Sequence, residues 1–246
     1  MINCYIKNSI AVILAGGFGT RVKHLLPNIP KPMAKVANKP FIEWIINYLQ
    51  QQNIDKFILS TGYLGEVIEE YFKQEFFAKI NINCYQENEP LGTAGGFINT
   101  VNLSNQIPDS WLVTNGDSLI FTDLNPMFNY LKNDDVEGVM LGLSLPDASR
   151  YGSLKYDDDY NLITFAEKQQ GKGVINAGVY IFKHSVINKF PDKKPLSFEY
   201  DVFPELLQKG CKIKVHITEA PFLDIGTPKT LIQAEKFIKN NWTFTP

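Results

Sequence analysis

The first half of the chain switches repeatedly between short apolar runs and segments in which apolar residues recur every three or four positions. A short apolar run predicts a buried strand, and the second spacing gives a helix one apolar face. The predicted strands span residues 10–14, 56–60, 80–85 and 111–113. The predicted helices between them are one marked by Phe41, Ile45, Tyr48 and Leu49, one spanning 64–72, and one marked by Ala94, Phe97, Ile98 and Val101. This alternation predicts a parallel sheet with helices on both faces.

The second half has a different pattern, with strand-like stretches separated by turn residues. Strands are predicted at 138–145, 153–156, 162–165, 174–182 and 212–217, and helices at 200–208 and 228–239. The acidic run Asp157-Asp158-Asp159 between two of these strands predicts a hairpin turn. Because no linker or internal repeat interrupts the pattern, a single α/β domain is predicted over residues 1–246. The predicted fold class is Rossmann-like: a mostly parallel central sheet flanked by helices, with a small antiparallel insertion.

The first predicted strand ends in a glycine-rich loop. The loop reads Leu14-Ala15-Gly16-Gly17-Phe18-Gly19-Thr20-Arg21. Glycines let backbone N–H groups approach a ligand closely, and a row of such groups forms an anion cradle. Arg21 and Lys31, the latter between two prolines, add cations that can reach phosphate oxygens. Glycine-rich turns without a ligand are also common after strands, but the two cations favour a polyphosphate site.

Two aspartates follow apolar stretches elsewhere in the chain. Asp117 comes after the predicted strand at 111–113 and an Asn-Gly turn, and Asp224 follows a second apolar stretch. Parallel sheets bind ligands at the carboxyl ends of their strands. Two carboxylates brought together beside a triphosphate would hold Mg²⁺, which prefers one or two carboxylates plus phosphate oxygens. The alternative is that both aspartates are solvated or capping residues in turns.

Composition narrows the class of protein. The net charge of −2 lacks the positive excess that is typical of nucleic-acid-binding proteins. An anionic substrate must therefore bind at a local positive site. Cys4, Cys84 and Cys211 are far apart and show neither a zinc pattern nor a redox pair, which is typical of reduced cytosolic thiols. No apolar run approaches the roughly 20 residues of a membrane helix, and the N-terminus lacks a signal-peptide pattern. We therefore expect a cytoplasmic protein with no membrane partner and no nucleic-acid partner.

The string L-A-G-G-x-G-T-R, followed by P-K-P, N-G-D and D-I-G-T-P, resembles the signature of the sugar-1-phosphate nucleotidyltransferases. These enzymes make an NDP-sugar and pyrophosphate from an NTP and a sugar 1-phosphate, on a fold of the nucleotide-diphospho-sugar transferase type. The resemblance runs from Ile10 to the last predicted helix. It implies nucleotide binding by Leu14, Ala15, Gly16, Gly17, Gly19, Thr20, Arg21 and Asp117.

The same resemblance implies catalytic roles for Arg21, Lys31 and Asp117. Arg21 would draw charge onto the departing pyrophosphate, and Lys31 would bridge the phosphates around the attacked phosphorus. Asp117 and Asp224 would bind Mg²⁺ as the cofactor. Because the attacking sugar phosphate is already an anion, positioning and charge neutralisation suffice, and no side-chain nucleophile is needed.

A second glycine-containing loop, residues 87–96, precedes the third predicted helix. Its residues alone make Thr93 a candidate helix N-cap. The segment E-P-L-G-T-A-G also resembles the base-recognition loop of guanylyltransferases in this family, and some uridylyltransferases carry a similar loop. A carboxylate can accept hydrogen bonds from both N1–H and the exocyclic amine of guanine. The resemblance therefore implies nucleotide binding by Glu87, Gly92 and Thr93, and it favours GTP.

Three segments of the second half carry the resemblance on the sugar side. Glu167 and Lys168 resemble the family's E-K motif, in which the Glu binds sugar hydroxyls and the Lys meets the sugar phosphate. Asn176 begins N-A-G-x-Y, whose Asn contacts the sugar, and Gly152 is implied in the same site. Gln169 stands where family members often have proline, so the choice of sugar stays open. Without the family, the Glu-Lys pair is a surface pair that contributes little.

Over the whole chain the resemblance is strongest to the D-glycero-D-manno-heptose 1-phosphate guanylyltransferases, which serve surface glycan synthesis. It implies GTP and heptose 1-phosphate as substrates; GTP with mannose 1-phosphate, or UTP with an amino-sugar 1-phosphate, stays open. The chain ends soon after the helix that follows Asp224, which favours short family members without a C-terminal β-helix domain. A homodimer stays open as well. A glycosyltransferase would have to hold metal through residues 157–159, and a non-catalytic relative would have lost the signature cations.

Overall fold

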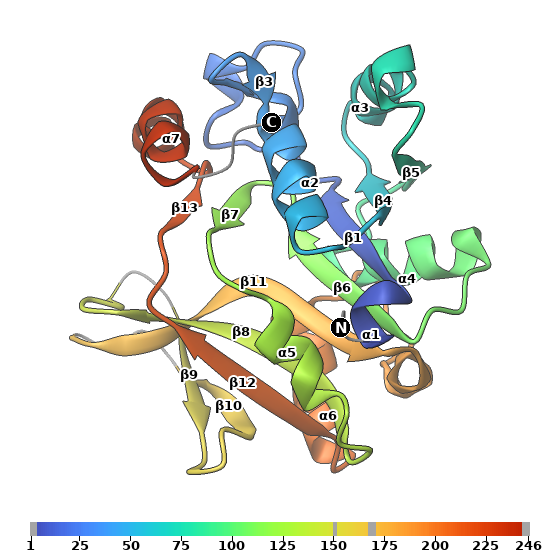
Figure 1. The fold of residues 1–246 in the computed structure, drawn as a ribbon, viewed down its shortest axis with the longest axis vertical. Helices are drawn as coiled ribbons and strands as arrows, with labels where there is room; N and C mark the ends of the chain where they lie inside the picture. The colour runs from blue at the N-terminus through green and yellow to red at the C-terminus, as the bar shows by residue number, and fades with distance from the viewer. Residues whose placement is uncertain (1–3, 150–151, 167–170, 243–246) are drawn as a thin grey trace.

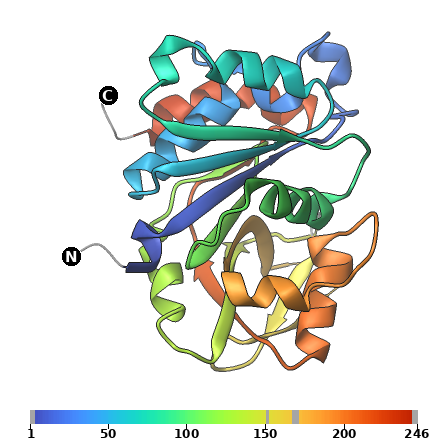
Figure 2. The ribbon, with the colours of Figure 1, turned by 90° about the vertical axis from the view of Figure 1, so that its right-hand side faces the viewer.

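A single sheet with two halves lies at the centre of the protein (Figures 1 and 2). Among the described residues, this sheet has nine strands. The structure is a computed structural model that describes residues 4–149, 152–166 and 171–242. Four neighbouring strands of the first half are parallel, in the order β5 (Asn81–Gln86), β4 (Lys56–Thr61), β1 (Ser9–Ala15) and β6 (Ser110–Asn115). Because these strands are parallel, their carboxyl ends lie at one edge of the sheet.

The second half is mostly antiparallel and continues the same sheet. β11 (Gly173–Lys183) pairs antiparallel with β6, with β8 (Val136–Leu145) and with β9 (Ser153–Tyr156). β9 pairs antiparallel with β10 (Leu162–Ala166), and β12 (Lys212–Thr218) pairs parallel with β8. β11 therefore joins the two halves. The Rossmann-like fold is confirmed, and the antiparallel strands extend the central sheet.

Both faces of the sheet are covered by helices (Figure 2). Along β1, Ala11 and Ile13 face one apolar core while Ile10 and Val12 face the other, which explains why this strand is a continuous apolar run. The first core includes residues of α1 (Cys4–Lys7), α2 (Phe41–Gln51), α3 (Gly65–Phe72), α5 (Asn125–Tyr130) and α7 (Pro228–Asn241). The second includes residues of α4 (Thr93–Ser104), α6 (Phe203–Gln208) and the helical turns His184–Lys189 and Phe198–Val202.

The strands and helices predicted from the apolar pattern are all present, with ends that shift by a few residues. The elements without such a pattern were not predicted. They are α1, α5, the helical turns Lys23–Leu25, Lys31–Met33, Glu75–Phe77 and His184–Lys189, and the strands β2 (Lys35–Val36), β3 (Lys39–Pro40), β7 (Ser118–Ile120) and β13 (Phe222–Asp224). Within the described ranges, no helix has the length and apolarity needed to cross a membrane.

The acidic run at 157–159 is the hairpin between β9 and β10, as predicted. The Asp157 carboxylate accepts from the N–H groups of Asp159 at 3.0 Å and Asn161 at 2.7 Å. Hydrogen bonds from Asn161 hold the pKa of Asp157 below its ordinary value. The Asp157 carboxylate therefore stabilises the hairpin turn.

Candidate active site

A cavity of about 350 Å³ opens at the carboxyl ends of the parallel strands. Ligands of open α/β sheets bind at this edge. Its wall includes nine residues predicted for nucleotide binding or catalysis: Leu14, Ala15, Gly16, Gly17, Lys31, Glu87, Gly92, Thr93 and Asp117. The rest of the wall is Phe18, Pro32, Ser60, Pro90, Gly96 and Asn115. Gly19, Thr20, Arg21 and Asp224 lie outside this wall.

The glycine loop has the backbone freedom that its sequence predicts. Gly19 has a φ of +59°, a left-handed conformation that residues with a side chain rarely adopt. Gly16 is closely packed, since an added Cβ would lie 2.7 Å from Oε1 of Glu87. An added Cβ on Gly17 would meet nothing within 4 Å. In the part of the chain that the structure describes, the N–H groups of Gly17 and Gly19 have no protein acceptor, so both can bind an anion.

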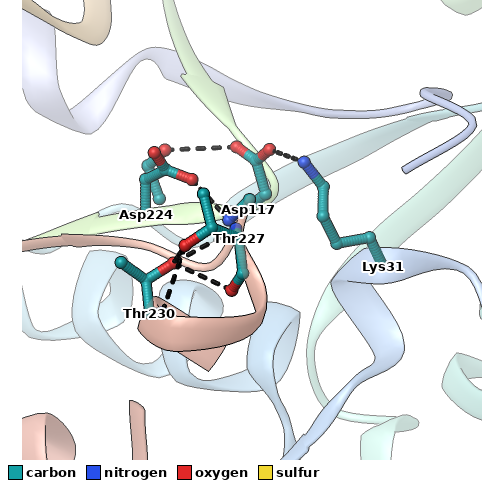
Figure 3. A network of polar contacts seen from close by, with 7 residues as sticks. Lys31, Asp117, Asp224, Thr227 and Thr230 are labelled. Atoms are coloured by element: carbon teal, nitrogen blue, oxygen red, sulfur yellow. Dashed lines mark hydrogen bonds and ion pairs between the residues drawn. The ribbon is translucent and has the colours of Figure 1, made fainter. Parts of the chain in front are cut away.

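Lys31 and Asp117 form an ion pair in the wall of the cavity (Figure 3). The Lys31 side chain is only 13% exposed, and its short helical turn is stiffened by the flanking prolines. The hydroxyl of Ser118 donates to Oδ1 of Asp117 at 3.1 Å. A cation and an anion thus hold each other at one end of the cavity.

Strand pairing brings Asp224 to the same place (Figure 3). β7 begins directly after Asp117 and pairs antiparallel with β13, so that Asp224 lies opposite Ser118. The N–H of Ile225 donates to the carbonyl oxygen of Asp117 at 2.9 Å. Among the described residues, no three acidic, histidine or cysteine side chains gather into a metal-binding group. Asp117 and Asp224 are the residues that would hold a metal here, and a pair of carboxylates is what Mg²⁺ prefers together with phosphate oxygens.

The turn after Asp224 is held by the start of α7. The N–H of Gly226 donates to the Asp224 carboxylate. Thr227 caps the helix: its hydroxyl accepts from the N–H of Thr230 at 3.2 Å, and its own N–H donates to Oγ1 of Thr230 at 3.2 Å. An added Cβ on Gly226 would lie 3.2 Å from Nη2 of Arg21 and 2.5 Å from Oδ1 of Asp224. Arg21 and Asp224 therefore flank the same glycine.

Glu87 stands between the glycine loop and the second loop. Its Oε2 accepts from the N–H of Leu91 at 3.3 Å. Added Cβ atoms on Gly62 and Gly96 would lie 2.8 and 3.4 Å from its carboxylate oxygens. Burial raises the pKa of Glu87, and the hydrogen bond from Leu91 opposes the rise. The surrounding glycines thus leave a slot for a partly desolvated carboxylate, a setting that strengthens a hydrogen bond to a donor.

The N-cap predicted for Thr93 is wrong. Gly92 is the N-cap of α4, with a φ of +80°, and no side chain caps this helix. The Thr93 hydroxyl instead accepts from the N–H of Phe198 at 3.2 Å. An added Cβ on Gly92 would lie 2.5 Å from the carbonyl oxygen of Leu196. The partner of the Thr93 hydroxyl thus lies more than a hundred positions away in the sequence. A local sequence pattern cannot reveal such a contact.

Asn176 lies near the same edge of the sheet, because β11 runs antiparallel to β6. Its Oδ1 accepts from the N–H of Gly178 at 2.9 Å. Its Nδ2 donates to the hydroxyl of Tyr180 at 2.7 Å and to Oε1 of Glu199 at 3.4 Å. Gly178 has a φ of +72°, and an added Cβ there would lie 2.3 Å from Nδ2 of Asn115, a residue of the cavity wall. Close packing thus joins the Asn176 segment to the cavity.

The other residues predicted for the sugar side are not brought into the cavity wall. Gly152 is exposed just before β9 and does not line the cavity. Glu167 and Lys168 lie outside the described residues. The sequence analysis assigned no role to the partners of Asn176, which are Tyr180 at the end of N-A-G-x-Y and Glu199. Glu199 lies immediately before a predicted helix, and no motif includes it. Nothing in the sequence around Glu199 therefore indicated a functional site.

Comparisons with known proteins agree with this geometry. The chain matches the family model described as "Nucleotidyl transferase" over residues 10–241. It is 38% identical to D-glycero-alpha-D-manno-heptose 1-phosphate guanylyltransferase of Campylobacter jejuni, over 89% of this chain and 95% of the relative. It is 36% identical to the protein of that name from Aneurinibacillus thermoaerophilus, over 94% of this chain and 98% of the relative.

A solved structure extends the similarity to three dimensions. HddC from Yersinia pseudotuberculosis, complexed with GMP-PN, matches with a TM-score of 0.78 and 34% sequence identity. The match covers 92% of this chain and 98% of that chain. The fold of this chain, with a cavity at the carboxyl ends of its parallel strands, agrees with these similarities. The chain belongs to the nucleotidyl transferase family.

Proposed function

We propose that this chain transfers a guanylyl group from GTP to D-glycero-D-manno-heptose 1-phosphate, forming a GDP-heptose and pyrophosphate. The observation that carries the proposal is the cavity wall, where the glycine loop, Lys31, Asp117 and Glu87 meet. Similarity over nearly the whole chain to two heptose 1-phosphate guanylyltransferases supports both substrates. The solved relative in complex with GMP-PN supports a guanine nucleotide.

The triphosphate binds along the glycine loop. The N–H groups of Gly17 and Gly19 donate to phosphate oxygens, since they have no acceptor within the described part of the protein. Lys31 then exchanges its partner: the phosphates offer oxyanions in place of the Asp117 carboxylate. This exchange frees Asp117 to act as a metal ligand beside Asp224. These two carboxylates would hold Mg²⁺, which would supply positive charge to the phosphate oxygens.

In the reaction, an oxygen of the sugar 1-phosphate forms a bond to the α-phosphorus of GTP. The bond from that phosphorus to the oxygen bridging the α- and β-phosphates breaks, and pyrophosphate carries the electron pair away. The nucleophile is already ionised, so no proton must be removed. Arg21, beside the turn that carries Asp224, neutralises charge on the departing pyrophosphate. Catalysis thus comes from positioning and charge neutralisation.

Glu87 supplies base selection. Guanine presents N1–H and the exocyclic amine side by side, and a carboxylate accepts from both. The position of Glu87 between Gly16, Gly62 and Gly96 supports this role, because the slot faces the cavity and excludes water from one side of the carboxylate. The backbone of Gly92 and the hydroxyl of Thr93 lie in the same wall.

On the sugar side, Asn176 contacts a sugar hydroxyl, together with Gly152, Glu167 and Lys168. Lys168 meets the sugar phosphate. Mannose 1-phosphate is the second candidate acceptor, since it shares the ring configuration of the heptose and lacks only the additional side-chain carbon. The reaction consumes GTP, a cytoplasmic metabolite, so we place it in the cytoplasm. A homodimer and a role in surface glycan synthesis complete the proposal.

The decisive experiment is a matrix of GTP, ATP, UTP, CTP and dTTP against heptose, mannose and glucosamine 1-phosphates, with Mg²⁺ and with pyrophosphate release as the readout. We expect GTP with heptose 1-phosphate to give the highest kcat/KM, and EDTA to abolish turnover. Preference for another nucleotide would show that the role of Glu87 is wrong. Release of pyrophosphate with none of the fifteen pairs of these substrates would exclude the proposed reaction.

A further inference from the structure

Behind Asn176 lies a short chain of hydrogen bonds to which the proposed reaction assigns no role. The hydroxyl of Tyr180 accepts from Nδ2 of Asn176 at 2.7 Å and donates to Oε1 of Glu199 at 3.0 Å. The hydroxyl of Ser197 donates to Oε2 of Glu199 at 3.0 Å. Tyr180 is 1% exposed, and burial together with Glu199 holds the pKa of Tyr180 well above its ordinary value. The tyrosine therefore keeps its proton and remains a donor to the carboxylate.

The directions of these hydrogen bonds follow from one another. Because the N–H of Gly178 can only donate, the atom of Asn176 that it meets at 2.9 Å is Oδ1. Nδ2 must then face Tyr180 and Glu199, and both of its protons are used there. An amide oxygen and a carboxylate oxygen each have two lone pairs. Oδ1 of Asn176 and Oε2 of Glu199 therefore each keep a lone pair that can accept a further hydrogen bond.

The segment that carries Glu199 also braces the nucleotide loop. The N–H of Leu196 donates to the carbonyl of Leu91 at 2.7 Å. The N–H of Phe198 donates to the hydroxyl of Thr93 at 3.2 Å. Leu91 lies in the loop that positions Glu87, and Thr93 lines the cavity. Glu199 is thus placed by the same backbone that supports the nucleotide side.

We propose that Glu199 is a positioning residue that acts through Tyr180 to present Asn176 to the sugar as a hydrogen-bond acceptor. The site then selects a sugar with a hydroxyl donor at that position and disfavours a deoxy, fluoro or methoxy analogue there. This inference rests on the proposed function, which places the sugar against Asn176. Neither Tyr180 nor Glu199 needs to touch the reacting atoms.

The test compares Tyr180→Phe and Glu199→Gln with Tyr200→Phe, a change on the same helical turn at a side chain that is 87% exposed. Loss of one buried hydrogen bond to a charged network should raise KM for heptose 1-phosphate about tenfold. KM for GTP and kcat should stay near the wild-type values, while the unfolding temperature of Tyr180→Phe should fall by a few degrees because buried partners lose a hydrogen bond. Tyr200→Phe should change none of these quantities.

A double-variant cycle separates positioning from a general structural effect. If Tyr180 acts through Asn176, then Tyr180→Phe should raise KM no further in the Asn176→Ala background. Independent, multiplying effects of the two substitutions would overturn the proposal, as would an equal rise of KM for GTP.

Calorimetry with heptose 1-phosphate, in the presence of GDP, keeps this test distinct from the proposed function. If the wild-type protein binds the sugar phosphate but transfers nothing, the proposed reaction fails, and the binding comparison still decides the role of Tyr180. About tenfold weaker binding by Tyr180→Phe supports the inference. Equal affinity, or no binding by the wild-type protein, overturns it.

Discussion

The proposed nucleotide side and the proposed sugar side of the site are built in different ways. On the nucleotide side, polar groups follow directly from the carboxyl ends of parallel strands, as Asp117 does after β6 and Glu87 does after β5. On the sugar side, Asn176 and Tyr180 lie within β11, and distant Glu199 orients them. Loop groups are specified by short contiguous motifs. Strand groups are specified by contacts between segments that are far apart in the sequence.

The difference between the two sides explains which parts of the site a motif describes. A loop that cradles an anion uses its own backbone N–H groups, so the residues that matter are neighbours in the chain. A side chain within a strand faces one side only, and its partners come from whichever segment packs there. Substitutions on the nucleotide side should therefore change the charge of the site and lower kcat. Changes on the sugar side should alter the fit of one substrate.

The largest effect should come from the charged pair on the nucleotide side. Asp117→Asn keeps the shape of the side chain and removes the charge that pairs with Lys31 and that the proposed Mg²⁺ would need. We expect kcat to fall by about 10²–10³, the usual loss for one electrostatic group. Asp157→Asn, in the exposed hairpin, is the matched control and should keep full activity. Pyrophosphate release measures both, and an Asp117→Asn enzyme with wild-type kcat would refute the charge-based account.

The next effect concerns the place where the backbone of Gly92 packs against the backbone of Leu196, between the two sides. Gly92→Ala would place a Cβ 2.5 Å from the carbonyl oxygen of Leu196, at a φ of +80°. Gly210→Ala carries the same kind of strain, at a φ of +73°, but its Cβ would meet nothing within 4 Å. The strain alone costs about 1–2 kcal/mol.

We therefore expect both glycine variants to unfold at lower urea concentration than the wild type, and Gly92→Ala to lose more stability than Gly210→Ala. Only Gly92→Ala should also raise KM for both substrates, since the Leu196 segment braces one side and carries Glu199 of the other. If KM for the sugar phosphate stays unchanged in Gly92→Ala, the two sides are mechanically independent.

A smaller effect should appear in base selection and its pH dependence. Burial raises the pKa of Glu87, so its carboxylate takes up a proton at a higher pH than an exposed glutamate. A protonated carboxyl accepts poorly from guanine, so KM for GTP should rise as pH falls toward this raised pKa. Glu87→Gln should weaken the binding of GTP about tenfold relative to ITP, which lacks the exocyclic amine. The rise of KM for GTP at low pH should also disappear in this variant. Exposed Glu89→Gln is the control, and an unchanged pH profile in Glu87→Gln would contradict the assignment.

The smallest effect is on stability. A folded-state pKa above the unfolded value means that the protonated form of Glu87 favours folding and that ionisation opposes it. The stabilising contribution is present below the unfolded pKa and is lost as pH rises through the folded pKa. Urea unfolding should therefore show Glu87→Gln gaining stability relative to the wild type between acidic and neutral pH. An opposite trend would mean that the carboxylate is stabilised by charge partners and not desolvated.

The fold was largely predictable because its elements are amphipathic or fully apolar. The run at 10–14 and the spacing of Phe41, Ile45, Tyr48 and Leu49 each record burial of residues that are close in the chain. The short strands β7 and β13 have only three residues each, too few for a period to show. Their pairing, which brings Asp117 and Asp224 together, therefore emerges only in three dimensions.

For the site, the motifs named most of the residues that line the cavity, while their roles in binding and catalysis stay predictions. The Thr93 cap failed for a physical reason: a local propensity competes with distant hydrogen-bond partners, and the N–H of Phe198 occupies the hydroxyl. Tyr180 was predicted as a strand residue and as the last residue of N-A-G-x-Y, without a role of its own. Its hydroxyl links Asn176 of the same strand to Glu199, which lies on a separate helical turn.

The sequence by itself determined the alternation of strands and helices, the glycine loop and the family to which the motifs point. These features depend on residues that are near one another in the chain, where burial and backbone freedom leave a local pattern. Only the tertiary structure decided that Lys31 pairs with Asp117, that Asp224 lies opposite Ser118, and that Glu199 accepts a hydrogen bond from Asn176. Those contacts join distant segments, and their energies depend on which strand edges meet and on which polar groups are buried together.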